Sequence, residues 1–226
     1  MTPHRSVLRS GLYAMLLMVS LLSTTATVVA APLSVARLRY EGGDWYCDPG
    51  SLANWLRLFR ERTGISTAAD PDVVDMQSED LYRHPLLYVT GHGVIDMSDD
   101  DVTELRRYLD AGGFLWADDN YGLDASFRQL IRRVYPDLEL TRLGSEHPIY
   151  HAYYDLPGLP KIHEHDGDPA QGYGVVDRGR LRVFYSWSSD IGDGLEDPQV
   201  HGDPADVREA AARMAVNVLM YALTHP

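Results

Sequence analysis

Residues 86–120 read LLYVTGHGVIDMSDDDVTELRRYLDAGGFLWADDN, and this stretch decides the fold class. The almost wholly apolar run 86–90 is typical of a strand that is buried on both faces. Ser98 begins a capping box, and Gly112 ends the following helix by taking a positive φ without strain. The apolar run 114–117 predicts a second buried strand. The stretch therefore predicts a strand, a helix and another strand.

This pattern also predicts where a functional site lies. A strand, a crossover helix and a second strand form a parallel pair of fixed hand. Two parallel strands end at the same edge of their sheet, so residues 91–93 and 118–120 should emerge side by side. Ligand sites of open α/β sheets lie at this carboxyl edge. The sequence therefore predicts where a candidate site lies, but this pattern alone does not indicate the chemistry of that site.

Strands and helices alternate along the rest of the chain. We expect further strands at 34–40, 72–76 and 138–143, a hairpin at 175–185, and helices that start at Asp48-Pro49, Leu123 and Asp203-Pro204. The first strand leads into residues 41–47, so Asp44 and Trp45 should join the carboxyl edge. The alternation predicts a three-layer, doubly wound α/β domain over residues 31–226, with a mostly parallel sheet in flavodoxin-like order.

Residues 1–30 have the pattern of a secretory signal peptide. Arg5 and Arg9 supply the positive start, residues 11–22 are mainly apolar, and small residues lead to a cleavage site after Ala30. We therefore expect an exported protein, periplasmic or secreted, with no stable membrane span after cleavage. An uncleaved segment that anchors the chain in a membrane is the alternative.

The charge of the chain argues against two classes of partner. The formal net charge is −13, and loss of Arg5 and Arg9 with the signal peptide makes it −13 − 2 = −15. Such an acidic protein is not expected to bind nucleic acid or anionic membranes. Cys47 is the single cysteine, so the chain cannot form an internal disulfide bond.

Candidate ligand-binding residues gather at the predicted carboxyl edge. The set is Asp44, Trp45, His92, Asp118, Asp119 and Asn120, together with His147 and His151 from an aperiodic segment. Within it, His92, Asp118 and Asp119 could bind a divalent metal ion, since imidazoles and carboxylates together suit zinc or manganese. The alternative is a structural role, in which Asp118 caps the next helix, His92 bonds a neighbouring loop and Asp44 holds the Gly42-Gly43 turn.

Other polar and aromatic segments have less specific patterns. We expect His163-Glu164-His165 to be an exposed loop rather than a metal-binding pair. The acidic segment containing Asp190, Asp193, Glu196 and Asp197 is expected to be a solvated loop, because its spacing lacks the EF-hand order. Cys47 could act as a nucleophile with a histidine, although nearby acids should raise its pKa. Aromatic rings in predicted loops could stack on sugars beside the carboxylates, and these are Trp45, Trp187, Tyr150, Tyr153 and Tyr154.

Six short motifs together resemble a known bacterial family. They are YEGGDWY at 40–46, DP at 48–49, LYVTGH at 87–92, GGFL at 112–115, DD at 118–119 and HPIYH at 147–151. Over essentially the whole mature chain they resemble the bacterial domain-of-unknown-function family 4159. The resemblance implies the fold of class I glutamine amidotransferases, which carry a nucleophilic cysteine at the turn after a central strand. Residues 116–120 hold acids at the matching turn, and the alternative turn at 90–93 has no cysteine either, so we expect no glutamine hydrolysis.

Two functions of different classes fit these patterns. The first is a binding module whose carboxyl-edge pocket holds a small polar or carbohydrate-like ligand, or a protein of the cell envelope. The second is a metal-assisted hydrolase in which His92, Asp118 and Asp119 bind the metal or activate water. Dependence on a metal separates the two, because a metal that binds only the folded state stabilises it.

Overall fold

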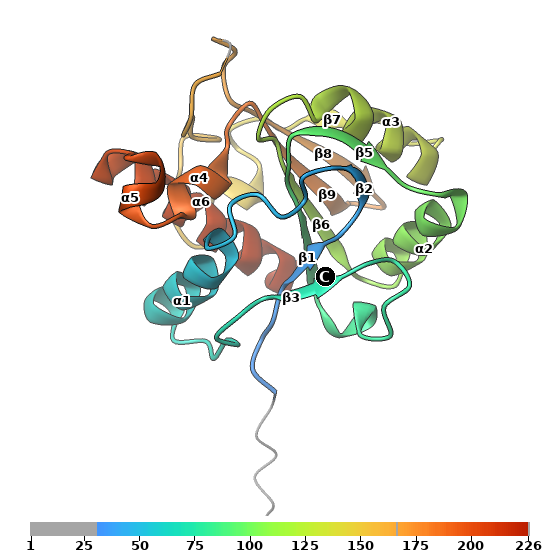
Figure 1. The fold of residues 1–226 in the computed structure, drawn as a ribbon, viewed down its shortest axis with the longest axis horizontal. Coiled ribbons are helices and arrows are strands. Elements are labelled where there is room, and N and C mark those ends of the chain that lie inside the picture. Colours follow the sequence, from blue (N-terminus) through green and yellow to red (C-terminus); the bar gives the residue numbers. More distant parts are fainter. Residues whose placement is uncertain (1–30, 166, 226) are drawn as a thin grey trace, which may run out of the picture. The chain divides into compact units, whose positions relative to one another are not determined.

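The computed structural model describes residues 31–165 and 167–225 (Figure 1). The fold is that of the compact unit Pro32–Pro226. The expected signal segment at residues 1–30 lies outside the described residues. In the described part of the chain, no helix combines the length and the apolar character needed to cross a membrane.

A seven-stranded sheet forms the middle of this unit. Its strands lie in the order β3 (Asp72–Val74), β1 (Ala36–Leu38), β4 (Leu86–Val89), β6 (Phe114–Asp118), β9 (Arg180–Trp187), β8 (Gln171–Asp177) and β7 (Thr141–Arg142). The first five strands are parallel, and β8 and β7 are each antiparallel to the strand before them in the sheet. In chain order, the parallel strands give the arrangement 2-1-3-4-5, which is flavodoxin-like. The expected α/β fold class is confirmed.

Helices cover both faces of the sheet. One face carries α1 (Ser51–Thr63) and α6 (Ala205–Thr224), and the other carries α2 (Asp99–Asp110) and α3 (Asp124–Val134). Successive strand residues point to alternate faces, so Tyr88 and Trp116 lie in the core under α1 and α6. Their neighbours Leu87 and Leu115 lie in the core under α2 and α3. Because both faces are buried, the central strands read as continuous apolar runs.

The sequence predicted the cap at the start of α2 correctly and the start of α1 wrongly. The Ser98 hydroxyl accepts a hydrogen bond from the Asp101 backbone N–H at 3.1 Å, and the Asp101 carboxylate accepts the Ser98 backbone N–H at 3.2 Å. In contrast, α1 begins at Ser51, because Asp48 adopts a φ of 50° outside the helix. The carboxylate of Glu196 caps α1 instead, and accepts hydrogen bonds of 2.7 and 3.0 Å from two backbone N–H groups at its start.

Other expected elements are shortened or differently capped. The strand expected at 138–143 is reduced to the two residues of β7, and α6 begins after Pro204 without a side-chain cap from Asp203. A small antiparallel ribbon of β2 (Glu41–Gly43) and β5 (Gly93–Asp96) was not expected, and it joins the loops that follow β1 and β4. Four short helices complete the unit: η1 (Leu81–Arg83), η2 (Pro148–Tyr150), α4 (Ile191–Leu195) and α5 (Pro198–His201).

Candidate functional site

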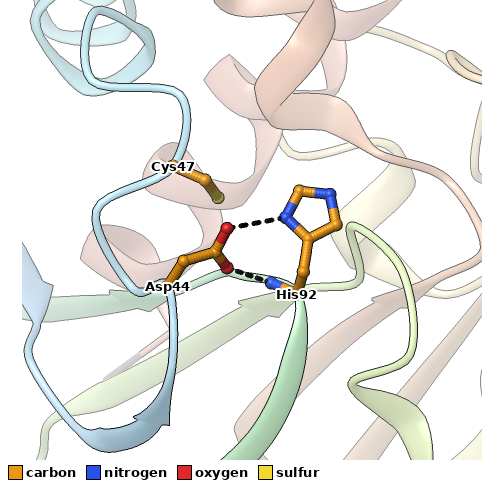
Figure 2. A group of neighbouring side chains, drawn as sticks. All are labelled: Asp44, Cys47 and His92. Carbon is orange, nitrogen blue, oxygen red and sulfur yellow. Dashed lines mark hydrogen bonds and ion pairs between the residues drawn. The ribbon is translucent and has the colours of Figure 1, made fainter.

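The carboxyl ends of β1 and β4 flank the switch point of the sheet. The chain leaves β1 toward α1 on one face and leaves β4 toward α2 on the other, so the direction of the crossovers reverses between these two strand ends. Asp44 follows β1 and β2, and His92 lies between β4 and β5. Figure 2 shows Asp44 and His92 facing each other, with Cys47 beside them.

Asp44 holds His92 by two hydrogen bonds. One carboxylate oxygen lies 2.9 Å from His92 Nδ1, and the other accepts the backbone N–H of His92. Ligand atoms of Asp44, His92 and Cys47 lie within 4.8 Å of one another. The ribbon of β2 and β5 brings this pair together, and the carboxylate fixes the orientation of the imidazole.

Cys47 lacks the features of a catalytic nucleophile. The Asn120 side-chain amide donates to its sulfur at 3.1 Å, and the thiol lies 3.4 Å from a carboxylate oxygen of Asp48. Burial first, and then the Asp48 carboxylate, raise the pKa of the Cys47 thiol well above its usual range. Because the thiolate is the reactive form, the raised pKa disfavours nucleophilic attack by this thiol at neutral pH.

Asp118 is fully enclosed and anchors α4. Its carboxylate accepts hydrogen bonds from the Ser186 hydroxyl, from the Tyr88 hydroxyl at 3.1 Å and from the Gly192 backbone N–H at 2.7 Å. Burial raises the pKa of Asp118 to about 6, although these donors act to lower it. Asp118 therefore does cap a helix, but that helix is α4 rather than the next one along the chain.

Asp119 lines an open pocket at the carboxyl ends of β6 and β9. The pocket has a volume of about 330 Å³, and its other lining residues are Asn120, Tyr121, Gly122, Asp124, His165, Trp187 and Ser188. One Asp119 oxygen accepts the Ser188 backbone N–H at 3.3 Å, while Oδ1 is buried without a hydrogen-bond partner among the described residues. Burial first, and then the Asp124 charge, raise the pKa of Asp119, against hydrogen bonds from Ser188, Tyr185 and Leu123 that act to lower it. A buried acceptor of this kind is costly unless a ligand, water or ion satisfies it.

The pocket adjoins the Asp44–His92 pair. The backbone of His92 forms an isolated parallel bridge with Tyr121, and the Gly93 N–H donates to the Tyr121 carbonyl at 3.3 Å. The Tyr121 ring lies 4.9 Å from the His165 ring, and Trp187 packs edge-on against Tyr173. Two aromatic residues thus line the same pocket as Asp119.

The acidic segment 190–197 is largely buried, so the expectation of a solvated loop is wrong. Asp190, Asp193 and Glu196 are 1%, 6% and 4% exposed. The helix α4 packs against α1 and α6, and Asp118 binds its first turn, which carries these acids into the protein. Burial first raises the pKa of both aspartates, and neighbouring carboxylates raise it further.

The loop at 163–165 is partly exposed, as expected, yet it directs two imidazoles at these acids. His165 Nε2 lies 3.1 Å from an Asp190 oxygen, and His163 Nδ1 lies 3.5 Å from an Asp193 oxygen. The two imidazole rings also contact each other, with centroids 4.7 Å apart. The alternating spacing of these histidines was visible in the sequence, but their buried partners were not.

Three of the expected ligand-binding residues lie away from the pocket. His147 contacts Tyr221, which in turn contacts Phe114 at the amino end of β6. His151 is bonded to the Asp155 carboxylate and to the Ser145 carbonyl. Trp45 packs against the core under α2 and α3. The aperiodic histidine segment therefore does not reach the carboxyl edge.

The expected metal ligands His92, Asp118 and Asp119 do not form a group. His92 is bonded to Asp44, and Asp118 is enclosed under α4. Within residues 31–165 and 167–225, the two groups whose ligand atoms lie within 4.8 Å of one another are Asp44–Cys47–His92 and Asp48–Asp193–His201. The second group joins positions more than a hundred residues apart, and no local spacing in the sequence indicates it.

Comparison with known proteins gives a family and no activity. The model of a family described as a domain of unknown function (DUF4159) matches residues 34–223. No curated protein matches the chain.

Proposed function

The chain belongs to the DUF4159 family, and from this premise we propose that the pocket at the carboxyl edge binds a small, polyhydroxylated, carbohydrate-like ligand. The observation that carries the proposal is the pocket itself, in which Asp119 and Asn120 lie beside Tyr121 and Trp187. The pocket lies at the carboxyl edge of the sheet, where ligands of open α/β sheets bind, although it is at β6 and β9 and the switch point is between β1 and β4.

The composition of the pocket supports this ligand class. Tyr121 and Trp187 offer ring faces for the apolar side of a sugar ring, and Asp119, Asp124 and Asn120 offer groups that bond hydroxyls. The volume of about 330 Å³ is at the small end of the roughly 300–1,000 Å³ of ligand pockets. Carboxylates in the wall favour neutral or cationic ligands over anions.

Binding of simple sugars tests the proposal. We would titrate the chain with neutral and amino monosaccharides and disaccharides, and measure heat and thermal stabilisation. The variants Trp187→Ala and Asp119→Asn should each weaken binding at least about tenfold, a loss of about 1.4 kcal/mol. Tyr121→Ala should weaken binding too, and Tyr82→Ala is its matched control, because Tyr82 and Tyr121 are both 53% exposed and Tyr82 lies on η1 before β4.

Two outcomes oppose the proposal. If no sugar in the set binds, or if binding is equal in Trp187→Ala and in the wild type, the pocket does not bind carbohydrate. A protein of the cell envelope would then be the ligand to seek, since Tyr121 is exposed beside the pocket.

We also propose that the protein does not hydrolyse glutamine. The single cysteine lies after β1, bonded to Asn120, and the turn after β6 carries Asp118 and Asp119. The raised pKa of the Cys47 thiol further disfavours nucleophilic attack. Release of ammonia from glutamine by the purified chain, abolished in Cys47→Ser, would contradict this.

We also propose that the protein is exported, because its first thirty residues have the pattern of a signal peptide. Their positive start, apolar run and small residues before Ala31 support cleavage and release into the periplasm or the medium. Mass spectrometry of the protein from its native host would give the mature N-terminus. A chain that starts at Met1 and sediments with membranes would favour the anchored alternative.

A further inference from the structure

Three side chains from separate segments meet beside the buried end of α4. Asp48 comes from the turn before α1, Asp193 lies on α4, and His201 ends α5. His201 Nε2 lies 3.2 Å from an Asp193 oxygen and 3.5 Å from an Asp48 oxygen. The two aspartates are buried, whereas His201 is partly exposed, so the group opens toward solvent on one side.

These distances are longer than direct charge-assisted hydrogen bonds, which measure about 2.7–2.9 Å. They match the separation of ligand atoms around a shared cation. A tetrahedral ion with bonds of about 2.0–2.2 Å holds neighbouring ligand atoms about 3.3–3.6 Å apart. The three side chains pair with one another, and their spacing is also close to that of ligands around one ion.

A carboxylate outside the group points to the same conclusion. Asp190 is 1% exposed, and its Oδ1 has no hydrogen-bond partner among the described residues. Burial first, and then the carboxylates of Asp193, Asp118 and Asp48, raise the pKa of Asp190, while its other oxygen lies 3.1 Å from His165 Nε2. Several buried carboxylates so close together repel each other, and a bound cation would offset that repulsion.

We propose that Asp48, Asp193 and His201 bind one divalent cation, either Mn²⁺ or Zn²⁺, at the junction of α1, α4 and α5. Two carboxylate oxygens and one imidazole nitrogen are a donor set that both ions accept. Three protein ligands leave a coordination position for water on the side of His201. The site is separate from the sugar pocket, although His165 contacts Asp190 and also lines that pocket.

Titration with the metal alone tests the proposal. The purified full chain, stripped with chelator and exchanged into metal-free buffer at pH 7, would be titrated with Mn²⁺ and with Zn²⁺ by calorimetry. We expect one ion per chain for at least one metal, and an increase in the unfolding midpoint when it binds. His201→Ala should raise the Kd at least about tenfold, as loss of even an indirect metal contact does.

His151→Ala is the matched control. His151 also pairs with a carboxylate, that of Asp155, and it belongs to neither group of potential metal ligands among the described residues. The His151→Ala variant should bind the metal with the same Kd as the wild type. Asp193→Asn, which keeps the size of the side chain, serves as the second variant if His201→Ala proves unstable, and it too should lose binding.

Three results would overturn the proposal. The first is an absence of binding to the stripped chain at millimolar metal. The second is weak binding of several ions that His201→Ala leaves unchanged, which would indicate diffuse attraction to an acidic surface. The third is loss of binding in Cys47→Ser but not in His201→Ala, which would place the ion at Asp44, Cys47 and His92. Sugar binding uses other residues, so each proposal can fail without the other.

Discussion

Glu196 is the single residue whose role depends most on the fold. Its carboxylate accepts two backbone N–H groups at the start of α1, although it lies about 145 residues further along the chain. A buried negative charge at a helix start bonds the free N–H groups and complements the helix dipole. No local pattern near α1 indicates this cap, and the sequence instead favoured Asp48.

Removal of this cap should destabilise the protein. We expect Glu196→Ala to lower the free energy of unfolding by about 2–3 kcal/mol, because two buried donors lose a charged acceptor. Glu196→Gln, which keeps an acceptor, should cost about 1 kcal/mol. Urea unfolding monitored by circular dichroism would measure both. The exposed Glu139→Ala is the control and should stay within about 0.5 kcal/mol of the wild type.

Asn217 holds the aperiodic segment onto α6. Its side-chain oxygen accepts the backbone N–H groups of Tyr153 and Tyr154 at 3.1 and 2.7 Å, and its Nδ2 donates to the Tyr154 carbonyl at 2.9 Å. Asn217→Ala should cost about 1–3 kcal/mol, because three partly buried backbone groups lose their partner. A change below about 0.5 kcal/mol in urea unfolding would show that solvent replaces these bonds.

At the scale of elements, the sequence predicted the strands and helices that have periodic apolar patterns. It did not predict the short helices whose position depends on tertiary contacts. The central strands, α2 and α3 follow from apolar runs and caps that act within one element. The helix α4 has two glycines in five residues, so its sequence IGDGL carries no helical signal. Its position depends on Asp118, which bonds the Gly192 N–H. The burial of Asp190 and Asp193 follows from that docking, and could not be predicted without it.

Gly192→Ala tests the packing of α4. In an ordinary helix, replacing Gly with Ala stabilises by up to about 1 kcal/mol. Here the new Cβ would lie 2.9 Å from the Tyr88 hydroxyl and 3.1 Å from an Asp48 oxygen. We therefore expect the opposite sign, a loss of about 1–3 kcal/mol from overpacking. A raised unfolding midpoint in differential scanning calorimetry would contradict the close packing of α4 on β4.

At the scale of the whole molecule, the sequence predicted the fold class, the strand order and the edge where Asp44 meets His92. Parallel strands bring their loops together whatever the side chains are, so topology alone was sufficient for that pair. Trp187 and Asp119 share the pocket because β9 lies next to β6, which the order of elements along the chain does not state. The group of Asp48, Asp193 and His201 forms only when the turn before α1 packs against α4 and α5, so the local sequence does not indicate it.

Buried acids should also set the pH dependence of stability. Burial raises the pKa of Asp118 to about 6, above an unfolded value of about 3.9. The folded state then holds a proton that the unfolded state has released, so this contribution is complete below about pH 4 and is lost as pH rises through 6. In chelator, the wild type should gain about 1 kcal/mol or more between pH 7.5 and pH 5. Asp118→Asn should reduce this gain, and an equal gain in both proteins would contradict the assignment.

We propose that the pocket at the ends of β6 and β9 binds a ligand. The indole signals of the tryptophans in a ¹H–¹⁵N spectrum give a direct test of this binding. The chain has four tryptophans. Trp55 and Trp116 are fully buried, and their indole N–H groups are bonded to Ala215 and Ser186, so they serve as internal controls. On titration with a sugar that binds, the Trp187 indole signal and the amides of residues 119–122 and 188 should shift together, with the controls unmoved. Binding that leaves the Trp187 signal in place, or shifts only signals elsewhere, would show that the sugar does not bind in this pocket.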